Sequence, residues 1–291
     1  MAAIDKKRVQ PPPILYKYCN LKTAKYIIND RRLKLSFLAD FNDVMELAPT
    51  WNASGDFKYI DPQIITDEIK KISSKKNLSS QEQFYIAASV ICRLYGRKFP
   101  ERNNFSEQEQ FLKDPSNFYI LSELMRRQCL CTCFSENYNI DLMWSHYADK
   151  HSGICIGFKT TAFRNAEKFV KIAYRRKRIT IKCDSNQLHG SHESAYTKGK
   201  QWKYEKEWRI VKAFEQSAFN FSEEQLFQFN IKRENDSFFL PFTYSAIQEI
   251  YFGIKSPSSI IEEIRNITPA SVSFYRIIPD KCEFSLTKQK I

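Results

Sequence analysis

The sequence predicts an α+β fold, in which a mixed or antiparallel sheet carries a helical insertion. Three observations lead to this prediction. Short strand-like segments recur on both sides of residues 55–127, that span carries amphipathic helical patterns, and hydrophobic residues make up 43% of the 291. This apolar fraction is enough to form a core. We therefore expect a single domain over residues 14–291, with its insertion at about 55–127, after a basic, proline-ended tail over residues 1–13.

Several short segments have the alternating or aliphatic character of β-strands. They are Ile14–Tyr18, Leu33–Phe37, Gln128–Ser135, Gly153–Phe158, Phe169–Tyr174, Glu207–Val211, Phe238–Leu240, Glu249–Phe252 and Val272–Ile278. The segment Gly190–Lys200 is expected to be a polar loop. Because the strands recur at both ends of the chain, the sheet is expected to join distant parts of the sequence.

Local signals predict helices between these strands. Asn20 is suited to cap a helix that follows the first strand. Asp141–Lys150 is expected to form a short helix, and Gly96 to end a helix of the insertion. Ser256 and Pro257 have the order of a cap followed by a first-turn proline, which predicts a helix near the C-terminus.

Composition and charge exclude some classes of function. The chain has only 7 glycines, none with the spacing of GxGxxG or GxxxxGK[ST], which excludes Rossmann and P-loop nucleotide sites. It lacks an apolar run long enough for a membrane span, and an apolar segment after the basic N-terminus, so we expect a cytoplasmic protein with no membrane partner. The net charge of +12 favours a polyanion such as RNA, DNA or an acidic partner, although it also fits a lysine-rich surface.

Three cysteines alternate along one expected strand. Cys129, Cys131 and Cys133 would point to the same face. Three thiolates on one face could bind a metal ion, but zinc sites favour a longer spacing and a fourth ligand. Burial in the core is the simpler interpretation, because free cysteine is among the most buried residue types. No metal site is expected.

Two aromatic and acidic clusters are candidates for chemistry. In the first, Trp144 and Tyr147 share a helix face, where they would either hold a flat ring between them or pack in the core. In the second, Glu205 and Glu207 stand at the start of a strand, where they point to opposite sides or fan around a bulge. A carboxylate there suits a general base or the stabilisation of a cationic transition state. The alternative is a surface ladder of ion pairs with Lys206 and Arg209.

Two basic segments are candidates for binding phosphate. Lys17 lies between Tyr16 and Tyr18 on the first expected strand, where it would hold a phosphate or protect an exposed sheet edge. Arg175, Arg176, Lys177 and Arg178 are consecutive cations, a pattern found in nucleic-acid-binding surfaces and equally at solvated strand ends.

Several motifs together resemble a known family. Its landmarks are similar to LYKY, FNDVMEL, CFSEN, MWSHYADKHSGICIGF, WKYEKEWRI and IQEIYFG, which occur here in that order between residues 15 and 253. On these motifs the chain resembles the bacterial domain of unknown function family 2971. The family description carries no activity.

A more remote resemblance implies an activity. The order of a basic residue on the first strand, a central serine motif and a late glutamate is similar to that of ADP-ribosyltransferases. These enzymes bind NAD in a cleft between two sheets without a glycine-rich loop. Carried over to this sequence, Glu207 would be the catalytic glutamate and Glu205 the upstream member of an E-x-E pair. Ser135 would stand at the central motif.

The same resemblance implies how NAD would be bound. Lys17 with Tyr16 and Tyr18 would stand at the first-strand motif, although the family pattern has arginine or histidine there. Trp144 or Tyr147 would stack on the nicotinamide ring, and Lys17 or Arg209 would neutralise the pyrophosphate.

The resemblance also implies a biological setting. Such a transferase would be a toxin or an anti-phage defence effector with a neutralising antitoxin protein. Its acceptor would be RNA, DNA or protein, with RNA favoured by the basic surface.

Two other functions are compatible with the sequence. One is a nuclease or other hydrolase, with or without a metal ion, that uses His146, Asp141 and the two glutamates. The other is a non-catalytic module that binds RNA or a protein through its basic face.

Overall fold

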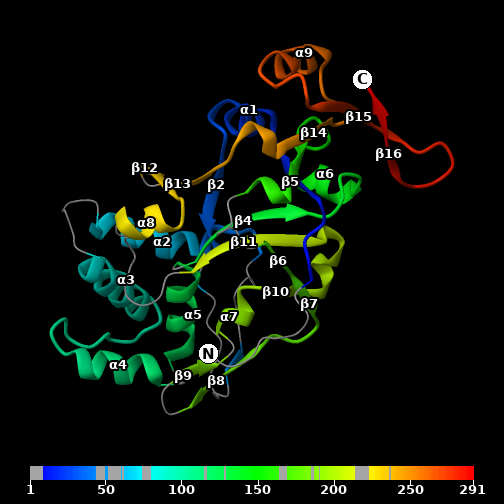
Figure 1. Cartoon of the computed structure of the whole chain (residues 1–291). Coiled ribbons are helices and arrows are strands. Elements are labelled where there is room, and N and C mark those ends of the chain that lie inside the picture. Colours follow the sequence, from blue (N-terminus) through cyan, green and yellow to red (C-terminus); the bar gives the residue numbers. More distant parts are fainter. Residues whose placement is uncertain are drawn as a thin grey trace.

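The computed structural model describes residues 9–43, 50–51, 60, 62–73, 80–114, 117–127, 129–163, 169–184, 187–189, 191–213, 223–235 and 237–291. Residues 1–8 of the expected tail lie outside the described residues. The α+β prediction is confirmed: one large mixed sheet crosses the molecule, helices gather beside one end of it, and β16 extends from the other end (Figure 1).

The large sheet joins strands from most of the described chain. Its main path is β12 (Lys232–Glu234), β13 (Ser237–Pro241), β2 (Arg32–Phe37), β4 (Cys129–Ser135), β1 (Ile14–Cys19), β5 (Ile154–Lys159), β14 (Ile247–Phe252), β15 (Ser273–Pro279) and β16 (Leu286–Lys290). β11 (Glu207–Ala213) branches from β4 and pairs in turn with β6 (Phe169–Lys171). Only β14 and β15 pair in parallel along the path, which makes the sheet mixed.

Smaller strands and the helices complete the described fold. β7 (Ala173–Arg175) pairs with β10 (Thr197–Gly199), and β8 (Thr180–Asp184) joins β3 (Thr50–Trp51) to β9 (Gln187–His189). The α-helices are α1 (Leu21–Asp30), α2 (Pro62–Ser73), α3 (Ser80–Leu94), α4 (Phe105–Lys113), α5 (Phe118–Arg126), α6 (Asp141–Tyr147), α7 (Ser191–Ser194), α8 (Glu223–Gln228) and α9 (Ser258–Asn266). The 3₁₀-helices are η1 (Leu38–Asp40), η3 (Thr160–Ala162), η4 (Lys200–Glu205) and η5 (Tyr244–Ala246).

The four helices α2 to α5 have an apolar core of their own. Ile65, Ile91, Phe99 and Leu124 are among its buried members, and none of them belongs to the core of the large sheet. Figure 1 shows these helices together on one side of the molecule, near the ends of the strands β2 and β4. None of the helices in the described part of the chain has the length and apolar character that a membrane span requires.

Three local predictions differ from the structure. The expected strand Phe169–Tyr174 is divided at Ile172. The Ile172 N–H still donates to the Glu207 carbonyl of β11, but the next N–H, that of Ala173, donates to the Tyr196 carbonyl, and β7 pairs with β10. The expected polar loop Gly190–Lys200 contains α7 and β10. Pro257 is the N-cap residue of α9, and the Ser256 hydroxyl donates to the carbonyls of Ser152 and Gly153.

The turn after α6 joins that helix tightly to the sheet. Asp149, Lys150 and His151 have φ values of 49°, 51° and 73°, in the left-handed region that non-glycine residues seldom adopt. The turn is held against the end of β14, since the Gly253 N–H donates to the Gly153 carbonyl over 3.0 Å. A Cβ atom on Gly253 would lie 2.1 Å from the His151 carbonyl oxygen. Only glycine fits this close approach of two backbone segments.

We therefore predict that Gly253→Ala destabilises the fold by about 1–3 kcal/mol, because the added methyl group forces two backbone segments apart. Chemical denaturation followed by circular dichroism measures this change. Gly199→Ala is the matched control, because the three atoms nearest to its added Cβ all belong to the flexible side chain of Gln201. Equal stability of the Gly253→Ala variant and the unchanged protein would show that the turn is not tightly packed.

Candidate functional site

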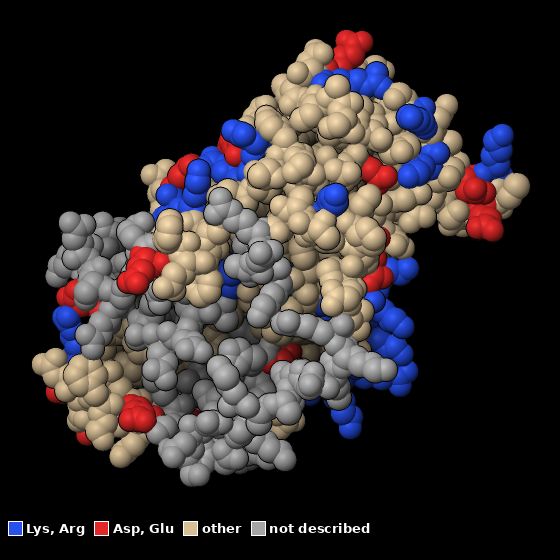
Figure 2. Space-filling model, viewed as in Figure 1, with Lys and Arg blue, Asp and Glu red and all other residues tan. Residues whose placement is uncertain are grey.

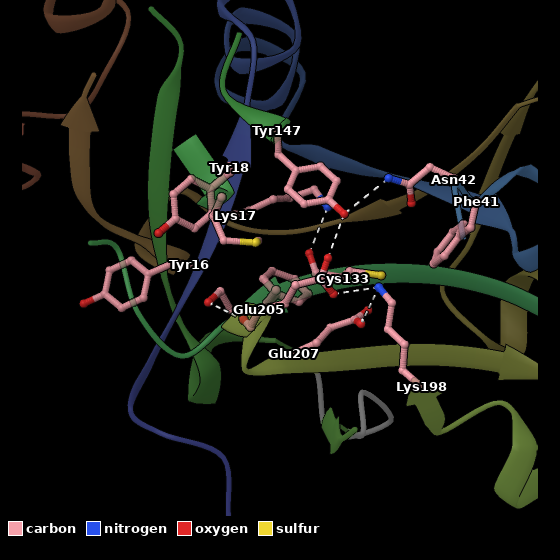
Figure 3. A pocket seen from close by; sticks show the side chains of 13 residues that line it. Tyr16, Lys17, Tyr18, Phe41, Asn42, Cys133, Tyr147, Lys198, Glu205 and Glu207 are labelled. Atoms are coloured by element: carbon pink, nitrogen blue, oxygen red, sulfur yellow. Dashed lines mark hydrogen bonds and ion pairs between the residues drawn. The ribbon is translucent and has the colours of Figure 1, made fainter. Parts of the chain in front are cut away.

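A cavity of about 340 Å³ lies where the large sheet divides. The described residues that line it come from β1, the segment after β2, β4, α6, β10, η4 and β11; they are Tyr16, Lys17, Tyr18, Phe41, Asn42, Cys133, Phe134, Ser135, Met143, Tyr147, Lys198, Glu205 and Glu207. Figure 3 shows side chains from these segments around one space. The structure thus brings together all three segments that the remote resemblance selected.

The cavity exists because β1 and β2 diverge over β4. β11 pairs with the whole of β4 along one edge, so β1 and β2 must share the other edge. On that edge β2 pairs only with Leu130 and Cys131, and β1 only with Ser135. The Lys17 ammonium enters the gap and donates to Thr132 Oγ1 and to the Cys133 carbonyl, each over 3.0 Å. Lys17 therefore supplies hydrogen bonds to the part of β4 that the divergence leaves without a strand partner.

Both glutamates reach the cavity because the backbone turns between them. Glu205 ends η4, Lys206 adopts a left-handed φ of 46°, and Glu207 begins β11. The two carboxylates therefore face the same cavity, as Figure 3 shows. Glu205 is 3% exposed and Glu207 4%, so the interpretation as a surface ladder of ion pairs is wrong.

Two cations neutralise the buried carboxylates. Arg209 binds Glu207 through two hydrogen bonds, Nε to Oε1 over 2.6 Å and Nη2 to Oε2 over 3.0 Å. The Lys198 ammonium lies between the acids, 2.6 Å from Glu205 Oε2 and 3.4 Å from Glu207 Oε2. All four side chains are buried. A buried charge is tolerated only with such partners, so these four residues form one electrostatic unit, which we call the charge quartet.

The quartet gives the two carboxyl groups different proton affinities. Burial alone would raise the pKa of Glu207, but the charge and hydrogen bonds of Arg209 outweigh it and hold that pKa at about 2. Burial raises the pKa of Glu205 above its usual value, although Lys198 acts in the opposite direction. Glu207 therefore stays ionised, while Glu205 accepts a proton more readily. Paired carboxyl groups separated in this way are typical of acid–base and electrostatic catalysis.

Ser135 and Tyr147 hold Glu205 from two sides. The Ser135 hydroxyl donates to the Glu205 carbonyl over 2.7 Å, so it positions the backbone of Glu205. The Tyr147 hydroxyl donates to Glu205 Oε1 over 2.7 Å and accepts a hydrogen bond from Asn42 Nδ2 at 3.5 Å. Figure 3 shows Tyr147 pointing from α6 toward the acids.

The other residues expected to bind NAD differ in their access to the cavity. Tyr16 and Tyr18 both line it, and their hydroxyl groups donate to the Glu249 carboxylate and to the Asn137 carbonyl, respectively. Trp144 is fully buried, does not line the cavity and donates its indole N–H to the Tyr138 carbonyl, so its expected stacking on a ligand is wrong.

Arg209 does not provide a free positive charge at the cavity. It is 0% exposed, its guanidinium binds Glu207 and the Ala195 carbonyl, and it does not line the cavity. The expectation that it neutralises a pyrophosphate is therefore wrong. Arg209 has a structural role instead: it binds the Glu207 carboxylate and keeps it charged.

Of the residues expected from the hydrolase interpretation, Glu205 and Glu207 line the cavity, but the other two do not. His146 and Asp141 are exposed and do not line the cavity. His151 Nε2 lies 3.7 Å from a carboxylate oxygen of Asp141. Among the described residues, no group of three or more His, Cys, Asp or Glu side chains is arranged to hold a metal ion.

The cysteines of β4 are free thiols. Cys129 and Cys131 are buried, and burial raises the pKa of Cys129 to about 12. The Cys131 and Cys133 sulfur atoms lie 3.7 Å apart, and their hydrogen bond, together with burial, raises the pKa of Cys133. Cys133 lines the cavity as a protonated thiol, which differs from the expectation of three core residues.

Lys198, Phe41 and Asn42 line the cavity but were not among the residues selected from the sequence as site residues. Lys198 lies in a segment that was expected to be a polar loop. Its burial depends on Glu205 and Glu207, which lie further along the chain. A sequence signal existed, because the lysine stands just before the WKYEKEWR motif. Phe41 and Asn42 belong to the FNDVMEL motif, in which the sequence pattern predicts for Asn42 no more than a helix cap.

The comparisons with known proteins support part of the resemblance. Residues 143–210 match a protein family described as protein of unknown function (DUF2971). This span includes Tyr147 and the whole charge quartet, but not β1. No curated protein and no solved structure matches the chain significantly. The similarity to ADP-ribosyltransferases remains a prediction.

We predict that Arg209→Met destabilises the protein by about 3–5 kcal/mol, because it leaves Glu207 buried without its main partner. The pKa of Glu207 is about 2 in the folded protein against 4.5 ordinarily, so its contribution to stability is complete above 4.5 and is lost as pH falls toward 2. Denaturation of the unchanged protein should show this loss, and the variant should show less of it.

Lys25→Met is the control for this prediction. It removes a cation from an ion pair with Glu263 whose partners are 34% and 48% exposed. Such surface pairs contribute at most about 1 kcal/mol. If Arg209→Met is as stable as Lys25→Met and keeps the same dependence on pH, the quartet does not fix the charge of Glu207.

Proposed function

We propose that this protein is an NAD-dependent ADP-ribosyltransferase, with Glu207 and Glu205 as its catalytic carboxylates. The observation that supports this most strongly is the pair of buried glutamates with separated proton affinities at one aromatic-walled cavity. The choice of reaction rests on the order of the motifs, which resembles that of ADP-ribosyltransferases. It also extends the proposal to a toxin or defence effector with a neutralising protein partner.

The charge on Glu207 suits the step that breaks the glycosidic bond. When the bond between nicotinamide and ribose C1′ breaks, the electron pair leaves with nicotinamide and positive charge develops on the sugar. A carboxylate that is held ionised stabilises this charge where water is excluded. Arg209 and Lys198 make Glu207 such a group, because they lower its pKa rather than supply its proton.

The raised pKa of Glu205 suits the second half of the transfer. A lone pair of the acceptor forms the new bond to C1′, and the proton of the acceptor must pass to a base. Efficient bases have a pKa raised toward the working pH. The pKa of Glu205 is shifted in this direction by burial, and the hydrogen bond from Tyr147 fixes one of its carboxylate oxygens.

The size and lining of the cavity fit one part of NAD. Ligand cavities usually have volumes of about 300–1,000 Å³. At about 340 Å³ this one suits the nicotinamide and its ribose, with the remainder of the dinucleotide outside. Phe41, Phe134 and Met143 provide apolar walls for a flat ring.

Glu207→Gln should lower the rate of ADP-ribosyl transfer about 100- to 1,000-fold, because it removes the charge that faces the developing cation. The assay follows label from adenylate-labelled NAD into total cellular RNA, DNA and protein, with products identified by mass spectrometry. Glu123→Gln is the matched control, since Glu123 is also buried and bonded to an arginine, Arg126, but does not line the cavity. Transfer that survives Glu207→Gln, or that is absent from the unchanged protein, contradicts the proposal.

Glu205→Gln should lower the transfer rate about 100-fold or more, because it removes the base that accepts the proton. A base must be ionised to act, so the rate of the unchanged protein should rise with pH through the raised pKa of Glu205. In the variant this rise should disappear. A pH profile unaltered by Glu205→Gln would show that another group accepts the proton.

A further inference from the structure

A second cavity, of about 160 Å³, lies beside the first. Its lining combines the end of β7 and the segment after it with residues around β10; it consists of Arg175, Arg176, Lys177, Arg178, Ile179, Ser194, Thr197, Lys198, Gly199 and Gln201. Because β7 and β10 pair in parallel, Gly199 lies opposite Arg175. The run of cations is therefore folded into a concave site rather than spread along a solvated strand end.

The cations of the run Arg175–Arg178 face the solvent, whereas Lys198 is buried. Arg175, Arg176 and Lys177 are exposed, and the ion pairs found among the described residues include none made by these three. Figure 2 shows Lys and Arg side chains gathered along the edge of the molecule near the position of β7 in Figure 1. Such a concentration of one sign of charge in a hollow attracts anions.

Lys198 connects this cavity with the carboxylates. It lines both cavities, and its ammonium lies 2.6 Å from Glu205. An anion bound by the cations of the second cavity would thus be separated from Glu205 by the side chain of Lys198. The two cavities are therefore placed to bind successive parts of one extended substrate.

We propose that the cavity lined by Arg175–Arg178 binds phosphodiester groups of a single-stranded nucleic acid and places the adjoining nucleotide at Glu205. The second half of this proposal rests on the proposed function, because it makes the strand the acceptor of ADP-ribose. The strand is single because a paired base cannot leave its stack to enter a cavity without being unpaired first.

The charge favours a strand over the pyrophosphate of NAD as the occupant. A pyrophosphate bridge carries two negative charges, whereas the exposed Arg175, Arg176 and Lys177 present three positive ones in sequence. Arginine also binds phosphate oxygens with two parallel hydrogen bonds. A chain of phosphates matches this arrangement, since each successive nucleotide brings another charge.

The test compares two triple variants with equal loss of charge. The first combines Arg175→Ala, Arg176→Ala and Lys177→Ala. The control combines Lys22→Ala, Lys34→Ala and Lys232→Ala, three exposed lysines that line neither cavity. Binding of a fluorescent 20-nucleotide single-stranded RNA, and of the DNA of the same sequence, is measured by anisotropy over a range of salt concentrations without NAD. Binding of NAD is measured separately by calorimetry.

The first triple variant should bind the strand about tenfold more weakly or worse, and the slope of log K against log salt should fall by about 2. The control should bind the strand nearly as the unchanged protein does, and NAD binding should not change in either variant. Equal weakening in both variants, or none, would mean that only net charge matters and would overturn the proposal. Loss of NAD binding with strand binding intact would assign the cavity to the dinucleotide and would also overturn it.

Failure of the proposed function gives a different result from failure of this inference. If no ADP-ribosyl transfer occurs but only the first triple variant loses the strand, the cavity is a nucleic-acid site and the transferase proposal fails. If transfer occurs and strand binding is unchanged in that variant, the transferase proposal holds and the acceptor is bound elsewhere.

Discussion

Mutual neutralisation of buried charges fixes the geometry of the cavity. Glu207, Glu205, Arg209 and Lys198 are all removed from water, and each carboxylate lies within 3 Å of at least one cation. Any shift of β10, η4 or β11 relative to the others would leave a charge unpaired in the interior, at a cost of several kcal/mol. The same arrangement separates the two acids chemically, because Arg209 binds Glu207 while Lys198 is closer to Glu205. Structural stability and the candidate chemistry therefore have one cause.

The second constraint is the division of the sheet at β4. A strand paired along its whole length leaves no room for a ligand, whereas β1 and β2 leave the middle of β4 open on one edge. Lys17 bonds with that middle section, Phe41 and Asn42 border it after β2, and the quartet lies on the β11 side. This explains how segments separated by almost 200 residues line one cavity. It also gives Lys17 a structural role that does not depend on a bound phosphate.

The sequence predicted the strands well where apolar residues alternate, and the cap of α1 is confirmed, since Asn20 accepts a hydrogen bond from the Thr23 N–H. Pairing partners were harder to predict. The break at Ile172 follows from the pairing of β7 with β10, and Trp144 is buried in a cluster with residues of β1, β5 and β14; a local pattern contains none of these partners. Lys198 was missed for the same reason, because a lysine is usually exposed unless distant acids surround it. The convergence of the candidate site was anticipated only through the order of motifs.

The central claim is that Arg209 and Lys198 keep one acid ionised and leave the other ready to accept a proton. The most direct measurement is an NMR titration of the carboxyl carbons of Glu205 and Glu207 in the folded protein, assigned with single Gln variants. The account predicts that Glu207 stays ionised down to the lowest pH at which the protein remains folded, while Glu205 titrates above the ordinary glutamate value of 4.5. Titration of both groups together near 4.5, or of Glu207 at the higher pH, would contradict it.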